Sequence, residues 1–131
     1  MTKTIFNPGS VPKPMGPYSQ GVVTTGGKLV FISGQVPQDA SGNLVGKGDL
    51  EAQTKQVFAN LKNMVEAAGG TVANIVKITI FMLKVTPQAY ETLGRVRREF
   101  WSGDFPASTL VEINRLASPD FLIEIEAFAV I

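Results

Sequence analysis

The 131-residue sequence contains no histidine and no cysteine. Without cysteine, the chain can form neither a disulfide framework nor a thiolate metal site. Without histidine, it can build neither a Ser-His-Asp or Cys-His catalytic site nor a histidine-ligated zinc site. Any chemistry must therefore use carboxylates, Arg or Lys, Tyr, Ser or Thr hydroxyl groups, or backbone N–H groups.

The sequence also lacks long apolar runs and a strong charge of one sign. No apolar run approaches the roughly 20 residues of a membrane span, and Met1 to Thr4 lead into a mixed segment rather than a signal peptide. The net charge is +1, and the one basic cluster, Arg95, Arg97 and Arg98, is typical of a solvated helix face. No basic run is long enough to follow a phosphate backbone. We therefore expect a cytoplasmic protein, with neither a membrane nor nucleic acid as its partner.

Length and composition favour one folded domain spanning residues 1–131. Hydrophobic residues make up 44% of the chain and charged residues 18%, which is a globular balance. A domain of this size buries roughly two thirds of the surface that its unfolded chain exposes, so a stable core is attainable. No repeat, low-complexity run or linker divides the sequence.

Two amphipathic helices are predicted from apolar residues at helical spacing. The first begins after Asp49, whose carboxylate can accept a backbone N–H of the first turn, and ends at Gly69, which can adopt the αL conformation. The second begins at Pro87 behind Thr86, because proline at the first helical position loses no hydrogen bond, and Gly103 closes it. The apolar stripe of the first helix comprises Leu50, Thr54, Val57, Phe58, Leu61, Met64, Val65 and Ala68.

Strands are predicted around these helices, giving the order β-β-α-β-α-β-β. They cover residues 21–25, 29–33, 75–83, 109–113 and 121–130, and a further strand at 3–6 would make six. Gly26 and Gly27 separate the first two runs and predict a hairpin, since glycine adopts positive φ at low cost. Alternation along 75–83 places Ile78 on one face and Ile75 with Lys77 on the other.

Two helices can cover only one face of such a sheet. The opposite face would carry Phe81, Leu122, Phe128 and Val130, too much apolar surface to remain in water. Another copy of the chain is the simplest cover, and a cyclic arrangement would close the interface. We therefore expect an α+β domain in an oligomer with small-molecule sites between subunits.

Two carboxylates on the last strand are candidates for chemistry. Glu124 and Glu126 point to the same face and could act as an acid/base pair, or each could pair with a Lys or Arg at a subunit contact. Beside Leu122 and Phe128 such a carboxylate would be partly desolvated, which raises its pKa.

Two glycine-containing segments are candidates for ligand binding. Tyr18 follows the Gly16-Pro17 turn, and Gly34 follows Ser33 at a strand end, where a ligand could approach bare backbone N–H groups. A plain turn and a packed tyrosine would explain the same residues.

Several short motifs extend in order along nearly the whole chain. They are Gly16-Pro17-Tyr18-Ser19-Gln20, Phe31-Ile32-Ser33-Gly34-Gln35-Val36-Pro37, Gly48-Asp49-Leu50-Glu51-Ala52-Gln53-Thr54, Pro106-Ala107, Val111-Glu112-Ile113 and Ile123-Glu124-Ile125-Glu126-Ala127. Any one alone is weak, but in order and spacing they resemble the Rid family of reactive-intermediate deaminases, also called the YjgF/YER057c/UK114 family.

The resemblance implies a chorismate-mutase-like α+β domain. In that architecture a five- to six-stranded mixed sheet carries two helices on one face. Three copies form a homotrimer whose sheets line an inner barrel, with a small-molecule cleft at each subunit interface. The resemblance also implies hydrolysis of imines or enamines, such as those that pyridoxal-phosphate enzymes release from serine or threonine, to 2-oxoacids and ammonia. No metal and no bound cofactor are implied.

The same resemblance implies roles for individual residues. Tyr18 matches the pocket tyrosine of the family. Ser33 and Gly34 match the strand end whose backbone contacts the ligand. Glu124 matches the glutamate that positions or activates the attacking water, which makes it the candidate catalytic residue.

The main departure from the family lies at Ser108, where deaminases usually have an arginine in a Pro-x-Arg-Ser motif. That arginine would bind the substrate carboxylate in a bidentate pair, which a hydroxyl group cannot reproduce. Gly94 and Arg97 also depart, since many relatives have Asn and Tyr there. We therefore expect a non-standard substrate, bound by Ser108 and Thr109 as neutral donors, with Arg97 able to restore a positive charge from the second helix.

Three functions remain open at this point. The first is a hydrolase or deaminase acting on imine or enamine intermediates. The second is a non-catalytic small-molecule-binding or regulatory trimer that kept the pocket. The third is an endoribonuclease or translation inhibitor, for which the sequence offers no basic stripe, no evident aromatic platform and no histidine.

Overall fold

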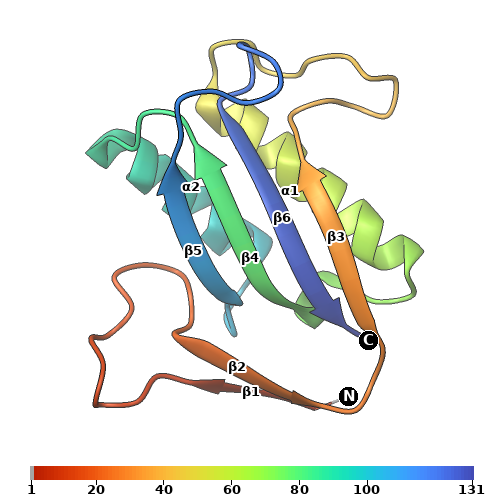
Figure 1. Cartoon of the computed structure of the whole chain (residues 1–131), viewed down its shortest axis with the longest axis vertical. Coiled ribbons are helices and arrows are strands. Elements are labelled where there is room, and N and C mark those ends of the chain that lie inside the picture. The colour runs from red at the N-terminus through yellow and green to blue at the C-terminus, as the bar shows by residue number, and fades with distance from the viewer. Residues whose placement is uncertain (1) are drawn as a thin grey trace.

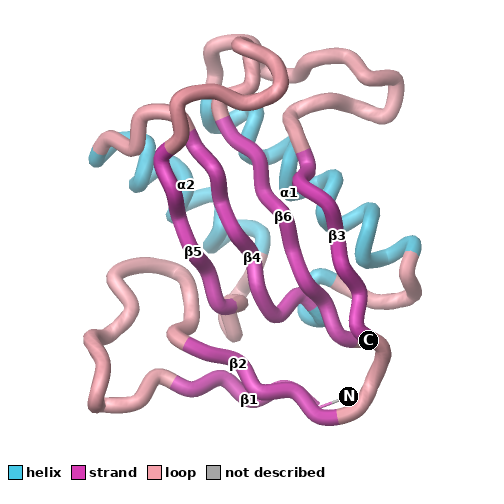
Figure 2. Tube along the Cα trace, viewed as in Figure 1, coloured by secondary structure: helices cyan, strands magenta, loops and turns pink. Residues whose placement is uncertain are grey.

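The computed structural model describes residues 2–131 and has an α+β fold, as the sequence predicts (Figure 1). Its elements are β1 (Thr2–Phe6), β2 (Gly21–Thr25), β3 (Leu29–Gln35), α1 (Leu50–Ala67), a short 3-10 helix η1 (Val72–Asn74), β4 (Ile75–Met82), α2 (Pro87–Phe100), β5 (Ala107–Glu112) and β6 (Ile123–Val130). Both helices lie on the same face of the main sheet (Figures 1 and 2).

The six strands divide into two sheets. The main sheet has the order β3-β6-β4-β5, and β1 pairs with β2 in a separate two-stranded ribbon at one end of it (Figure 2). Strand β6 is antiparallel to both of its neighbours, whereas β5 runs parallel to β4. The main sheet is therefore mixed, and β3 and β5 are its two edges.

The predicted hairpin between β2 and β3 is wrong, although both strands form. Gly26 and Gly27 have positive φ angles of 69° and 86°. However, Thr25 pairs with Thr2 of β1, and Lys28 exchanges backbone hydrogen bonds of 2.6 and 2.9 Å with Ile131. Two glycines allow several chain directions, and hydrogen bonds between segments distant in the sequence decide which strand pairs with which.

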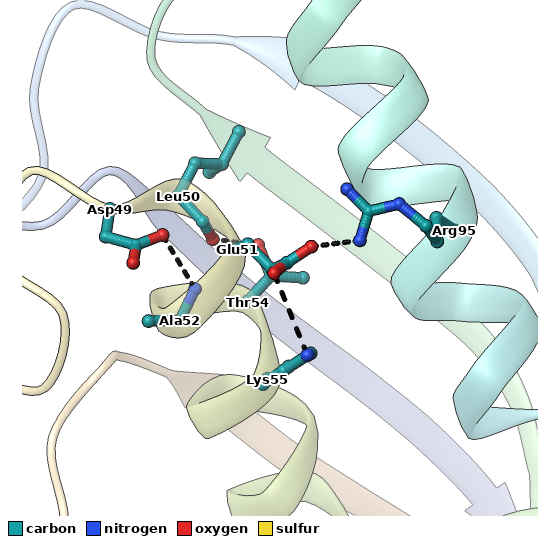
Figure 3. Close-up of polar contacts among 7 residues, drawn as sticks. All are labelled: Asp49, Leu50, Glu51, Ala52, Thr54, Lys55 and Arg95. Carbon is teal, nitrogen blue, oxygen red and sulfur yellow. Dashed lines mark hydrogen bonds and ion pairs between the residues drawn. The ribbon is translucent and has the colours of Figure 1, made fainter.

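The helix boundaries follow the predicted signals. Asp49 Oδ1 accepts the Ala52 N–H at 3.1 Å (Figure 3), and Thr86 caps α2 in the same way. Helix α1 closes through Gly69, which has a φ of 99°. Neither helix of residues 2–131 is long and apolar enough to cross a membrane.

A surface ion-pair cluster joins the two helices. Glu51 of α1 bonds to Arg95 of α2 and lies 3.8 Å from Lys55 in the next turn of α1 (Figure 3). Arg95 lowers the pKa of Glu51, mainly through the hydrogen bond. Because all three side chains are exposed or nearly so, water and salt screen the pairs and they add little to stability.

The core lies between the helices and the main sheet. Its buried residues come from both helices and from β3, β4 and β6, and they include Val57, Phe58, Leu61, Leu93, Ile78, Ile80, Ile123, Ile125 and Ala127. Three predictions about facing were wrong. Met64 is 43% exposed, Val130 is buried, and Ile75 is buried because a shift in register separates it from Lys77.

The sheet face opposite the helices is apolar, as the sequence predicts. Phe31 is 68% exposed and Phe128 39% exposed, and their rings meet edge to face with centroids 5.3 Å apart. Leu29 and Val111 add exposed apolar surface on β3 and β5. Within residues 2–131 no element covers this pair of aromatic rings.

Candidate functional site

Glu124 of β6 and Gly34 of the neighbouring edge strand β3 lie against each other. A β-carbon built at position 34 would overlap the Glu124 carboxylate, so only glycine fits there without displacing it. The Glu124 side chain is partly buried. Burial is the main cause that raises the pKa of its carboxyl group, and the neighbouring Glu126 raises it further. The structure thus brings together two of the residues that the sequence suggested.

Ser33 precedes Gly34 at an irregularity in β3. Ile32 pairs with Ala127 and Gln35 pairs with Ile125, so Ser33 and Gly34 together stand opposite a single residue of β6. Such a bulge re-aims side chains and interrupts the ladder. A cavity of about 320 Å³ opens beside Gly34, lined by Gln35, Val36, Gln38, Asp39, Ala40, Gln56, Asn60 and Asn63. We call Ser33, Gly34 and Glu124 the β3–β6 cluster.

Tyr18 is fixed beside the start of β5. Its hydroxyl oxygen accepts the Met15 N–H at 3.2 Å. The next residue, Ser19, donates its N–H to the Pro106 carbonyl at 3.1 Å and forms an isolated parallel bridge with Ala107. The loop that carries Tyr18 is therefore attached to the strand that carries Ser108.

Arg97 reaches Ser108 from α2. Its Nη1 donates to the Ser108 hydroxyl oxygen at 3.3 Å, and only 2% of the residue is exposed. Burial lowers the pKa of the guanidinium, the neighbouring Arg98 lowers it further, and Tyr90 and Tyr18 partly oppose these effects. We call Tyr18, Arg97 and Ser108 the β5 cluster.

Thr109 does not join the β5 cluster. Ser108 stands opposite the buried Ile78, so it faces the helices, whereas its neighbour Thr109 stands opposite Thr79 and faces away. The Thr109 hydroxyl accepts a hydrogen bond of 2.6 Å from Lys77. Adjacent strand residues point to opposite faces, so Ser108 and Thr109 cannot bind one small ligand from the same side of a single chain.

The two clusters are far apart in one chain. Ser108 on β5 and Glu124 on β6 are separated by β4, which corresponds to about 10 Å across two strand spacings. They also differ by three residues along the ladder, because Glu124 is level with Phe81 and Ser108 with Ile78, and this adds about 10 Å in the other direction. A ligand that touches both clusters therefore needs a second chain.

Gln53 supports Glu124 from inside the core, a role the sequence reasoning missed. Its amide is fully buried, donates to the carbonyls of Gly46 and Asp120 at 3.1 and 2.9 Å, and accepts the Leu122 N–H at 2.8 Å. These bonds hold the loop that enters β6 two residues before Glu124. The available signal was a polar residue beside the apolar stripe, inside the Gly48–Thr54 motif.

Two further features of residues 2–131 bear on cofactor binding: the spacing of the acidic side chains, and a second cavity beside β1. No three acidic side chains in this part of the chain lie close enough to bind a metal ion. A cavity of about 730 Å³ lies between β1 and the end of α2, away from both clusters. Lys3 spans it and donates to the carbonyls of Ala73 and Asp104 at 3.0 and 3.2 Å, which attaches the ribbon to the body of the domain.

Comparison with known proteins gives matches over nearly the whole chain. The family model described as Endoribonuclease L-PSP matches residues 9–131. A RutC family protein of Pyrococcus horikoshii is 38% identical over 98% of both chains. The Rid family protein YyfB of Yersinia pestis is 33% identical and superimposes with a TM-score of 0.93 over all of both chains. TdcF of E. coli, solved with bound serine, is 33% identical with a TM-score of 0.71 over 97% of this chain and 98% of that one.

Proposed function

Because the chain belongs to the Rid family, also described as Endoribonuclease L-PSP, we propose that it hydrolyses imine or enamine intermediates to carbonyl compounds and ammonia. The observation that carries this proposal is the placement of Glu124. Its carboxylate lies against the bare backbone of Gly34, and burial together with Glu126 raises its pKa. A carboxyl group with a raised pKa is suited to accept and return a proton during a reaction.

The chemistry needs one proton-transfer group and one water. Glu124 accepts a proton from the water as the water oxygen bonds to the carbon of the protonated imine, which gives a neutral carbinolamine. The carboxyl group then returns its proton to the nitrogen, the C–N bond breaks and ammonia leaves as the C=O bond forms. The hydroxyl proton passes to the Glu124 carboxylate and from there to solvent. An enamine enters the same sequence after protonation at carbon. No group is oxidised or reduced, so the proposed reaction is a hydrolysis.

We further propose that the site is completed in a homotrimer. The β5 cluster and the β3–β6 cluster occupy opposite edges of the main sheet, so two edges from different chains can meet in one cleft. The exposed pair Phe31 and Phe128 would be covered in the same assembly. Rotational symmetry among three copies closes such edge-to-edge contacts without leaving a free end.

The test compares Glu124→Gln with wild type. An amino-acid oxidase generates 2-iminobutyrate in situ, and semicarbazide traps the imine that survives. The wild-type protein should lower the amount of imine that semicarbazide traps. With Glu124→Gln, the amount trapped should equal that measured without protein. Glu91→Gln, an exposed residue of α2, serves as the matched control and should behave as wild type. If the wild-type protein shortens the lifetime of neither 2-iminobutyrate nor the enamine formed from serine, the proposal is wrong.

A second candidate function is ligand binding without catalysis. The observation that favours it is Ser108, which leaves β5 without a guanidinium group. TdcF, a relative, was solved with serine bound. A binding protein would gain thermal stability with its ligand by mass action while forming no product, and Glu124→Ala would leave that gain unchanged.

A further inference from the structure

We propose that Arg97 is the anion-binding residue of this site, so that α2 supplies the guanidinium that β5 lacks, and that the ligand carries a carboxylate. The inference deepens the proposed function by naming the substrate class, and it rests on the same site. The starting observation is the hydrogen bond between Arg97 and Ser108. Ser108 occupies the position at which related deaminases usually have the carboxylate-binding arginine.

The first argument is a buried charge without a counter-ion. Arg97 is 2% exposed, and its Nε is buried without a hydrogen-bond partner. The ion pairs formed within residues 2–131 involve Lys55, Lys62 and Arg95 but not Arg97. Burying a charge costs free energy unless an opposite charge pairs with it. An anion that paired with Arg97 would compensate this buried charge.

The second argument is the chemistry of the groups around the guanidinium. Both tyrosines of the chain, Tyr18 and Tyr90, lie close enough to influence Arg97, and Ser108 is within hydrogen-bond distance. A hydroxyl group can hydrogen-bond to the guanidinium, but it is not the carboxylate that would pair with its charge. The Tyr18 oxygen already accepts the Met15 N–H, so its own proton remains free to donate. A small carboxylate at Arg97 would meet hydroxyl donors and the nearby positive charge of Arg98.

The unpaired Nε also indicates how the anion would bind. A guanidinium binds a carboxylate in a fork, with two N–H groups meeting two oxygens. Nη1 is occupied by Ser108, while Nε–H is free and lies on the other edge of the group. That edge offers the parallel donors for a planar carboxylate.

The three departures from the family pattern, Gly94, Arg97 and Ser108, are structurally compatible with one another. Gly94 lies one turn before Arg97, and a β-carbon there would already be within 3.8 Å of Pro17. A longer side chain at position 94 would push away the loop that carries Tyr18. Gly94 thus admits the loop, Arg97 supplies the charge, and Ser108 leaves room for the guanidinium.

The test measures binding of 2-oxobutyrate and of its neutral amide to the intact protein by titration calorimetry. Wild type should prefer the carboxylate to the amide. Arg97→Met should weaken 2-oxobutyrate binding at least about 30-fold, the loss expected when one partner of a buried charge pair is removed, and should leave amide binding unchanged. Lys62→Met, an exposed residue of α1 that pairs with Glu66, is the control and should keep the preference of wild type.

The ligand-free stability of Arg97→Met separates an anion site from a structural arginine. Removal of an uncompensated buried charge should leave the melting temperature unchanged or raise it. A lower melting temperature together with equal loss of both ligands would overturn the proposal, as would an unchanged preference for 2-oxobutyrate. Should Arg97→Met fail to fold, Arg97→Lys decides: it keeps the charge and should keep a preference for the carboxylate, and loss of that preference overturns the proposal.

Binding and turnover can fail independently. Absence of imine hydrolysis in wild type would refute the proposed function and leave the anion site standing if 2-oxobutyrate still binds through Arg97. Conversely, hydrolysis of 2-iminobutyrate with unchanged kcat/KM in Arg97→Met would refute the anion site alone.

Discussion

The carboxylate of Glu124 occupies the space that a side chain at Gly34 would need. The two residues belong to neighbouring antiparallel strands, and the bulge at Ser33 and Gly34 turns the bare glycine toward the carboxylate. The proposed proton-transfer group is thereby held against the bare main chain of Gly34. This relation is the most direct link between the fold and the proposed chemistry.

Replacing Gly34 with alanine should reduce turnover and leave the fold intact. The new methyl group would displace the flexible end of Glu124, and a shift of about 1 Å in a catalytic group can cost as much as 100-fold in rate. We expect kcat/KM for 2-iminobutyrate to fall at least about tenfold, with little change in the unfolding midpoint. Gly9→Ala, which would meet no atom within 4 Å, is the matched control. Equal activity of the two variants would contradict the arrangement.

The pH dependence of turnover should report the raised pKa of Glu124. As the base, Glu124 acts when ionised, so activity is lost as pH falls through its raised pKa, and the acid limb should lie above the usual range for a glutamate. Glu126→Gln removes the like charge and should move that limb to lower pH, although not to the ordinary value, because burial remains the main cause.

The control for this profile is again a distant glutamate. Glu91→Gln should leave the acid limb where it is in wild type. Lys77 on β4 also faces Glu126, so Lys77→Met tests whether the lysine screens the pair. Removal of that positive charge should shift the limb to higher pH. If Glu126→Gln leaves the acid limb of the pH profile unchanged, that limb reports the ionisation of a group other than Glu124.

Gln53→Leu should destabilise the protein by about 2–6 kcal/mol, because it leaves two partly buried groups unsatisfied at about 1–3 kcal/mol each. These are the Asp120 carbonyl and the Leu122 N–H, whereas the Gly46 carbonyl keeps the N–H of Asp49. Urea unfolding at a fixed protein concentration measures the change, since assembly makes stability concentration-dependent. Gln88→Leu, exposed on α2, should change stability by less than about 0.5 kcal/mol.

Phe31→Lys should disrupt the proposed trimer. Phe31 and Phe128 form an exposed aromatic pair on the face opposite the helices, and a lysine there would place a charge in a contact between apolar surfaces. Sedimentation velocity should show wild type as a trimer and the variant as smaller species. Met64→Lys, on α1 and 43% exposed, should leave the trimer intact. A wild-type monomer would contradict the proposed assembly.

Local signals in the sequence were sufficient for most elements of the fold. Asp49 and Thr86 cap the helices that they predict, because a cap involves residues only three apart. The alternation of β6 correctly separates Glu124 from its buried neighbours Ile123 and Ile125. Polar residues inside the core were not predictable in this way. Gln53 is buried because backbone groups from two distant loops meet its amide.

The sequence by itself determined the secondary structure, the apolar second face of the sheet and the residues available for chemistry, because these depend on short-range spacing and on composition. Only the tertiary structure decided that β2 pairs with β1, that Glu124 lies against Gly34, and that Arg97 meets Ser108 while Thr109 turns away. Each of these relations joins segments distant along the chain. Their geometry follows from packing and hydrogen bonding across the whole domain, which no local pattern records.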